Sequence, residues 1–193
     1  MELDKDTIEK VRRALGPRSL VLVGLMGCGK SSIGKRLASR LGLPFIDADE
    51  EIERVAQKSI SEIFQDHGEA FFRDRECKVI TRLLAAGPQV LATGGGAFMM
   101  AETRERIREA GLSVWLRADL PVLLRRVSKR DTRPLLKGGD AETVMRNLME
   151  KRYPVYAEAE ITIESRDVPH ETIVTEIITA VARHLSLAQV API

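Results

Sequence analysis

Apolar and polar positions divide the chain into short apolar runs and longer segments of helical period. The runs at 19–23 and 89–92 are apolar rather than alternating, which is typical of central parallel strands covered on both faces, so we expect them to be neighbours. Residues 160–164 alternate, which predicts an edge strand. Further strands are predicted at 43–46 and 112–116, and helices at 30–41, 50–58, 60–66, 69–86, 102–110, 120–127, 141–153 and 171–187. The pattern predicts an α/β fold.

The composition supports one globular domain and excludes several classes of function. Of the 193 residues, 44% are hydrophobic and 30% charged, which is enough apolar material for a sizeable core. A net charge of +2 is far below the large positive charge that is typical of a nucleic-acid-binding protein. The longest apolar stretches, 20–29 and 90–101, are shorter than the roughly 20 residues of a membrane span. Because the chain begins with a mixed, acidic stretch rather than a signal peptide, we expect a cytoplasmic protein.

The segment Gly24–Ser31 matches the pattern G-x-x-x-x-G-K-[ST] between a predicted strand and a predicted helix. In this context the glycines let backbone N–H groups surround a phosphate, Lys30 reaches the β- and γ-phosphates, and the Ser31 hydroxyl binds Mg²⁺. The alternative is a glycine-rich turn with an exposed lysine. We interpret Cys28, at a variable position of the loop, as a small filler rather than a nucleophile. The motif by itself indicates only a nucleoside triphosphate.

Two carboxylates follow the predicted strand at 43–46. If the chain is still extended there, Asp47 and Asp49 point to the same side, one to organise the Mg²⁺ shell and the other to hydrogen-bond an acceptor hydroxyl. The alternative is that Asp49 merely caps the following helix. Whether Asp49 accepts the hydroxyl proton or only orients it is left open by the sequence.

A second group of candidates combines glycines with arginines. Gly94–Gly96 directly follow a core strand, where an open parallel sheet binds its ligands, although a plain flexible turn is the alternative. Arginine captures carboxylate or phosphate through two parallel hydrogen bonds. Three arginines stand out because aromatic residues or proline adjoin them: Arg73, Arg133 and Arg152. For any other arginine, the usual alternative is a solvent-exposed residue on a helix. The basic, Gly-Gly-containing segment 128–139 indicates a mobile lid.

Taken together, these residues resemble the shikimate kinase family over nearly all of Leu20–Leu187. The marks are Gly24–Ser31, Asp47-Ala48-Asp49, Gly68-Glu69 with Phe72-Arg73, Thr93–Gly96, Arg133–Leu136, and Lys151-Arg152 ahead of Tyr156. The resemblance implies a five-stranded parallel sheet with helices on both faces and a mobile lid, similar to nucleoside monophosphate kinases. It also implies ATP and Mg²⁺ as cofactors and transfer of the γ-phosphoryl group to the 3-hydroxyl of shikimate.

The resemblance assigns roles to residues by position. It places Asp49 at the acceptor hydroxyl, Arg73 and Arg152 at the shikimate carboxylate, and the backbone of Gly94, Gly95 and Gly96 at a ring hydroxyl. It implies that Ser31 and, through water, Asp47 hold the metal, and that Arg133 swings in from the lid toward the transferring group. The implied nucleotide contacts are Gly27, Cys28, Gly29, Lys30, Ser31, Ser32, Arg126, Arg133 and, as a weaker candidate, Arg166. Phe64, Phe72, Glu76 and Leu135 would line or support the pocket.

The organisation expected from this resemblance is one kinase domain at 19–193 after an N-terminal extension at 1–18. The domain would include a substrate-binding segment at about 47–88 and the lid at 128–139. We expect a monomer whose partner is the small molecule shikimate, with neither nucleic acid nor membrane. Two rivals are another small-metabolite kinase, such as a gluconate kinase, and a non-catalytic nucleotide-binding module.

Overall fold

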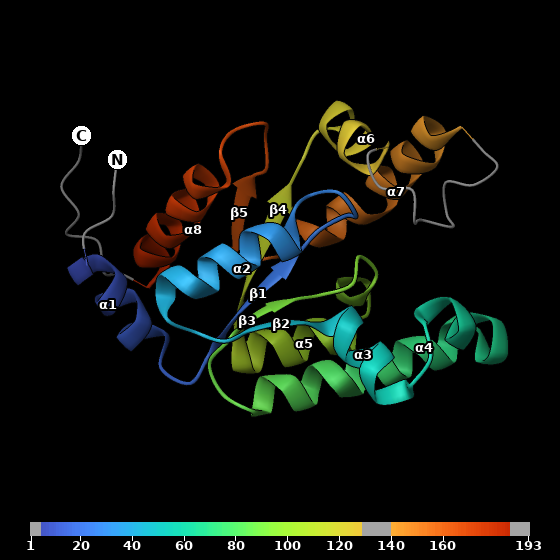
Figure 1. The fold of residues 1–193 in the computed structure, drawn as a ribbon, viewed down its shortest axis with the longest axis horizontal. Helices are drawn as coiled ribbons and strands as arrows, with labels where there is room; N and C mark the ends of the chain where they lie inside the picture. The colour runs from blue at the N-terminus through green and yellow to red at the C-terminus, as the bar shows by residue number, and fades with distance from the viewer. Residues whose placement is uncertain (1–4, 129–139, 186–193) are drawn as a thin grey trace.

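The computed structural model describes residues 5–128 and 140–185. Its centre is a five-stranded sheet of order β2-β3-β1-β4-β5, in which every neighbouring pair is parallel (Figure 1). The strands are β1 (Ser19–Val23), β2 (Phe45–Asp47), β3 (Val90–Ala92), β4 (Gly111–Arg117) and β5 (Ile161–Glu164). The predicted fold class is confirmed, and the two apolar runs are neighbours, with Leu20 opposite Val90.

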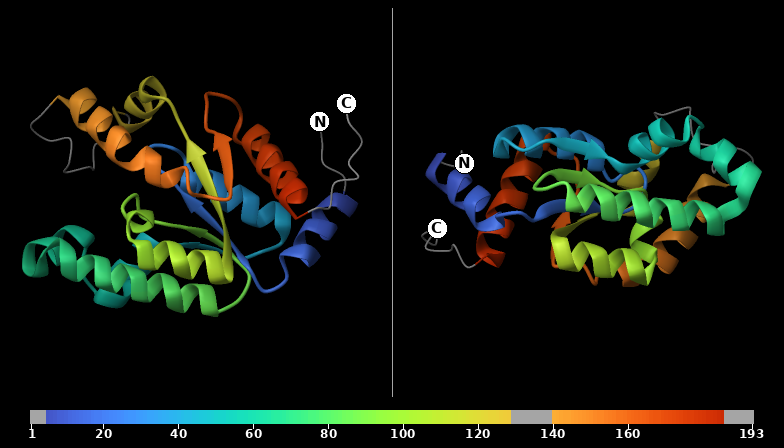
Figure 2. Two further views of the ribbon diagram at one scale, coloured as in Figure 1. Left: turned by 180° about the vertical axis from the view of Figure 1, so that it is seen from behind. Right: turned by 90° about the horizontal axis from the view of Figure 1, so that it is seen from below.

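Helices cover both faces of the sheet (Figure 2). α2 and α8 pack together on one face, and α4 and α5 pack together on the other. The helices are α1 (Lys5–Leu15), α2 (Lys30–Leu41), α3 (Ala48–Ala56), α4 (Ile60–Ala85), α5 (Ala101–Ala110), α6 (Leu120–Ser128), α7 (Ala141–Tyr156) and α8 (His170–His184), with a short 3₁₀ helix, η1 (Ala97–Met99). Because both faces are covered, all five residues of β1 are buried.

The edge strand and the first helix show how burial follows the sequence pattern. β5 alternates between buried and exposed residues, which confirms the edge strand predicted from its alternation. α1 packs against α2 and α8, and its Val11 and Leu15 are 0% and 1% exposed within the main core. The helix in the predicted extension therefore contributes to the hydrophobic core, although it adds no strand to the sheet.

Several helix boundaries differ from the prediction by one to three residues. The two helices predicted at 60–66 and 69–86 lie within one element, α4, and the break predicted between them is present at Gly68, which is non-helical at φ 79° and ψ 174°. A capping box begins this helix, since Ser59 and Glu62 exchange side-chain and backbone hydrogen bonds. α7 continues three residues beyond the predicted end at Tyr153, although it contains Pro154, and its last residue, Tyr156, is completely buried.

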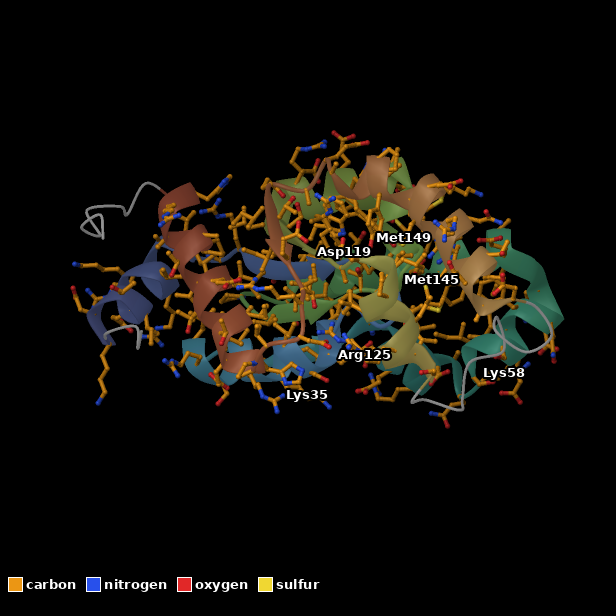
Figure 3. The ribbon with its side chains drawn as sticks, turned by 90° about the horizontal axis from the view of Figure 1, so that it is seen from above. Lys35, Lys58, Asp119, Arg125, Met145 and Met149 are labelled. Carbon is orange, nitrogen blue, oxygen red and sulfur yellow. The ribbon has the colours of Figure 1, made fainter. Side chains whose placement is uncertain are left out.

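α6 and α7 lie together beside the carboxyl end of the sheet. Met145, which is completely buried, and Met149 are one turn apart on α7, where this helix packs against α6 (Figure 3). The predicted lid at 128–139 lies outside the described residues, apart from Ser128. Its residues Arg133 and Leu135 therefore receive no structural description. The described part of the fold brings the carboxyl ends of β1, β2 and β3 to one edge, where the candidate site lies.

Candidate active site

The loop between β1 and α2 is built on glycines with a left-handed backbone. Gly24, Gly27 and Gly29 have φ of 139°, 82° and 99°, a region that residues with a side chain rarely adopt. A Cβ atom on Gly24 would also lie 2.8 Å from the Leu116 carbonyl oxygen, so the position has no room for one. The loop ends with Gly29 as the N-cap of α2. Backbone N–H groups and the helix dipole favour an anion at such a terminus.

Lys30 begins α2 and reaches back over this loop. Its Nζ donates to the carbonyl oxygens of Gly24 at 2.7 Å and Leu25 at 3.1 Å. The Cys28 Sγ lies 3.8 Å from the same ammonium group and is buried in the core. The loop thus holds the positive charge of Lys30 close to its backbone, and the Cys28 side chain packs in the core under the loop.

Asp47 links the loop to α3. Its Oδ2 accepts a hydrogen bond of 2.7 Å from the Ser31 hydroxyl, and its Oδ1 accepts one of 3.1 Å from the Asp49 N–H. Asp47 is therefore the N-cap of α3, and the expectation of an extended chain through Asp49 is wrong. The alternative, Asp49 as the cap, is also wrong, because the helix begins at Ala48 and the Asp47 carboxylate accepts from the N–H group of Asp49. Both carboxylates nevertheless line one cleft.

Asp49 and Glu76 approach the same glycine from two helices. A Cβ atom on Gly94 would lie 2.6 Å from the Asp49 Oδ1 and 2.7 Å from the Glu76 Oε1. Burial, and next the charge of Asp47, raises the pKa of Asp49. Burial raises the pKa of Glu76 to about 6, although the neighbouring Arg73 opposes the shift. Only glycine fits at position 94 while both carboxyl groups keep these places.

Arg73 lies on α4 between acidic and aromatic side chains. It donates from Nη1 to the Glu76 Oε2 at 2.6 Å and pairs with Glu69 at 3.3 Å. Its guanidinium carbon lies 5.1 Å and 5.9 Å from the ring centres of Phe72 and Phe64, within the range of a cation–π contact. These contacts hold the guanidinium group on the cleft wall, and a Cβ atom on the facing Gly96 would collide with it.

Arg152 reaches the glycine loop from α7. Its Nη1 donates to the Gly95 carbonyl oxygen at 2.9 Å. The Tyr156 hydroxyl donates to the same oxygen. Arg152 thus touches Gly95 while Arg73 faces Gly96, so two guanidinium groups from different helices meet at consecutive residues of one loop.

Three basic residues lie around the far end of the cleft. Arg126 of α6 donates to the Ser165 hydroxyl at 2.8 Å and to the Arg166 carbonyl oxygen at 2.8 Å, and it lines the cleft. The Arg166 side chain instead pairs with Glu176 of α8. His170 also lines the cleft, and burial, together with Arg36 and Arg126, lowers its pKa. Sequence reasoning did not single out His170, because only its place at the start of a predicted helix marks it.

These residues surround one continuous cleft of about 870 Å³. It brings together the predicted Lys30, Ser31, Ser32, Asp47, Asp49, Arg73, Gly94–Gly96, Arg126 and Arg152, with Gly27, Gly29, Phe64, Phe72 and Glu76. Among the described residues, the lining does not include Cys28 or Arg166, so the structure does not bring these two candidates into the cleft. Their predicted nucleotide contacts remain predictions. Met26, at a variable position of the P-loop, also lines the cleft, as do Glu50, Glu53 and Ile60, whose positions carry no motif signal.

A phosphate-binding loop at the end of a central parallel strand, next to a cleft with carboxylates and arginines, defines the class of P-loop kinases that act on small molecules. The family model for shikimate kinase matches residues 26–182. The chain therefore belongs to the shikimate kinase family, as the sequence motifs predicted, and this is a family of ATP-dependent kinases.

Individual relatives agree with this family. A shikimate kinase from Rhodopseudomonas palustris is 58% identical over 179 residues, covering 93% of this chain and 88% of that protein. One from Brucella canis is 54% identical over 183 residues, covering 95% and 92%. The solved structure of shikimate kinase from Acinetobacter baumannii in complex with shikimate superposes with a TM-score of 0.83 and 36% identity, over 92% of this chain and 99% of that one.

None of the helices within residues 5–128 and 140–185 is long and apolar enough to cross a membrane. The same part of the chain holds no group of three or more His, Cys, Asp or Glu side chains that could bind a metal ion.

Proposed function

We propose that this chain transfers the γ-phosphoryl group of ATP to the 3-hydroxyl group of shikimate in the cleft described above. The observation that carries the proposal is the convergence of Arg73 and Arg152 on the glycine loop. Paired guanidinium groups bind a carboxylate strongly and in a defined orientation. The complex of the Acinetobacter baumannii relative with shikimate supports an acceptor of this kind.

The P-loop provides the phosphate end of the site. Backbone N–H groups at Gly27 and Gly29 and the N-terminus of α2 favour a polyphosphate, and the Ser32 side chain lines the same part of the cleft. The ammonium group of Lys30 already lies over the loop, where it would exchange carbonyl partners for phosphate oxygens. Positioning and charge neutralisation are the main demands of phosphoryl transfer.

Ser31 and Asp47 fit Mg²⁺ by the chemistry of their donors. Their oxygens are 2.7 Å apart at the edge of the P-loop, and Mg²⁺ at such sites takes one or two protein oxygens and completes its shell with phosphates and water. A pair of donors is thus sufficient without a dedicated cluster. Bound there, Mg²⁺ would neutralise negative charge on the phosphates.

At the acceptor end, Asp49 would accept a hydrogen bond from the 3-hydroxyl group. In the reaction this hydroxyl oxygen forms the new bond to the γ-phosphorus, the bond to the leaving oxygen of ADP breaks, and the hydroxyl proton is released. Arg73 and Arg152 would hold the carboxylate on the opposite part of the ring, and the backbone of Gly94–Gly96 would contact a ring hydroxyl. Each group acts mainly by orienting the acceptor.

The test is a comparison of acceptors in a coupled assay of ADP release. We expect turnover with shikimate to exceed turnover with gluconate and with nucleoside monophosphates, with an acceptor-free reaction measuring background ATP hydrolysis. Activity with gluconate alone would overturn the proposal. ATP binding without turnover on any of these acceptors would favour the non-catalytic module.

Several finer expectations belong to the same proposal. Arg133 would approach the transferring group, and Arg126 would contact adenine, with Arg166 as the weaker candidate. We further propose a cytoplasmic monomer that binds neither nucleic acid nor membrane, in one kinase domain at 19–193. Size-exclusion chromatography with light scattering would test the oligomeric state, since a stable dimer would contradict it.

A further inference from the structure

One carbonyl group in the cleft is held by two donors from a single helix. The Gly95 oxygen accepts from the Arg152 Nη1 at 2.9 Å and from the Tyr156 hydroxyl. Arg152 and Tyr156 are four residues apart on α7, so they lie one above the other on the same side of the helix. Because a carbonyl oxygen has two lone pairs, these two donors satisfy it completely.

From this arrangement we infer that Tyr156 is a positioning residue for the acceptor, acting through the Gly95 carbonyl on the glycine loop and on Arg152. The inference rests on the proposed function, since it assigns Tyr156 to the binding of shikimate rather than of ATP. Tyr156 itself is completely buried and does not line the cleft among the described residues, so it acts without touching the substrate.

Peptide planarity explains how an anchor on the carbonyl sets the loop. The C=O of Gly95 and the N–H of Gly96 belong to one rigid peptide unit and point in opposite directions. Fixing the oxygen toward α7 therefore fixes the direction of that N–H group. Three consecutive glycines would otherwise rotate easily, because they lack the side chains that restrict the backbone.

The ring and the hydroxyl group of Tyr156 have different contacts. The ring packs with Trp115 of β4 and Phe98 of η1, with ring centres 5.9 Å and 6.4 Å apart. A phenylalanine would fill this space equally well. The hydroxyl is an additional feature: it donates to the Gly95 oxygen and also interacts with the Arg152 side chain. Burial also raises the pKa of Tyr156 despite the nearby Arg152, so the group remains a donor at working pH.

The shared acceptor also affects Arg152. One of its Nη groups is directed to Gly95, which leaves other N–H groups of the guanidinium for a carboxylate. With the Tyr156 hydroxyl gone, the loop would depend on Arg152 alone. The orientations of the loop N–H groups and of the guanidinium group would then both be less restricted.

Tyr153 provides a matched control in the same aromatic cluster. Its ring centre is 5.0 Å from that of Trp115 and 6.3 Å from that of Tyr156. Its hydroxyl donates to the Ala118 carbonyl oxygen, away from the glycine loop. Tyr153→Phe and Tyr156→Phe therefore each remove one hydroxyl group that donates to a backbone carbonyl oxygen, but only Tyr156→Phe removes a donor to Gly95.

The experiment measures kcat and both KM values for these two variants and the wild type. We expect Tyr156→Phe to raise the KM for shikimate roughly 5- to 20-fold, as loss of a buried hydrogen bond does, with kcat and the KM for ATP changed less than about twofold. Tyr153→Phe should keep both KM values within about twofold of wild type. Calorimetric titration of shikimate into the folded proteins should reproduce the difference in Kd.

Other outcomes would overturn the inference. These are an unchanged KM for shikimate in Tyr156→Phe, an equal rise in both KM values, or the same rise in Tyr153→Phe, which would indicate a general packing effect. Thermal melts of all three proteins establish that the kinetics refer to folded enzyme. A wild-type protein inactive on shikimate would instead refute the proposed function, so the two failures are distinguishable.

Discussion

Lys30 and Asp49 line the same cleft but hold different partners. Lys30 lies over the P-loop, whereas Asp49 lies beside Gly94 at the acceptor end. Lys30→Ala should lower kcat/KM by at least about 10²-fold, as loss of a preorganised charge does. Asp49→Asn should abolish most turnover of shikimate and leave ATP affinity nearly intact.

Calorimetric titration of ATP and steady-state kinetics on both variants check this pair. Activity within a few fold of wild type in Lys30→Ala would contradict the phosphate assignment. A large loss of ATP affinity in Asp49→Asn would place that carboxylate in the metal site instead.

Glu76 makes stability depend on pH because it is 1% exposed. Its pKa is about 6 in the folded protein against an ordinary value of 4.5. The native state therefore binds more protons than the unfolded state between these values, so this contribution to stability is complete below pH 4.5 and is lost as pH rises through about 6. The shift corresponds to about 2 kcal/mol.

Urea unfolding of the wild type and of Glu76→Gln tests this dependence. From neutral pH down to pH 4.5, the free energy of unfolding of the wild type should rise relative to Glu76→Gln by about 2 kcal/mol. The variant is the control, because all other titrating groups are the same in the two proteins. A difference between the two proteins that stays constant with pH would contradict the prediction.

At the scale of elements, α1 contributes to the stability of the core although it lies outside the sheet. Leu15→Ala would remove a side chain that is 1% exposed in the core, and we expect a loss of about 2–5 kcal/mol in the free energy of unfolding. Lys10→Ala on the exposed side of the same helix should change it by less than about 0.5 kcal/mol.

Denaturant melts of these two variants measure the contribution of α1. The KM values should be unchanged at temperatures where both proteins are folded, because α1 does not line the cleft. Equal stability of Leu15→Ala and wild type would show that this helix is dispensable for folding.

Element boundaries show where sequence pattern stops being sufficient. β1 was predictable because its buried residues form an uninterrupted apolar run, and β5 because its residues alternate. The sequence left open whether the chain stays extended through Asp49 or whether Asp49 caps the next helix, and neither holds. Asp47 is the cap instead, and its carboxylate also accepts a hydrogen bond from the Ser31 hydroxyl of α2, a contact between distant segments.

At the scale of the whole molecule, the cleft is assembled from segments that span most of the chain. Ligand binding should therefore stabilise the entire fold. Shikimate at about 100 times its Kd should raise the free energy of unfolding by about 2.7 kcal/mol if it binds only the native state. For a protein of this size, that corresponds to roughly 5–10 °C in Tm.

Thermal melts with shikimate and with the same concentration of gluconate measure this effect. Arg73→Ala is the further control, because it should lose most of the shift due to shikimate. No shift in the wild type at any concentration would contradict binding of shikimate to the native state.

The sequence by itself determined the α/β class, the P-loop and most of the side chains that line the cleft, because local periodicity and motif spacing carry these features. Only the tertiary structure decided that Arg73 and Arg152 meet at Gly95 and Gly96, that Glu76 is buried beside Asp49, and that Arg166 pairs with Glu176. These facts depend on which helices pack together. Orientation and burial arise from contacts between residues far apart in the chain, and local sequence patterns do not encode them.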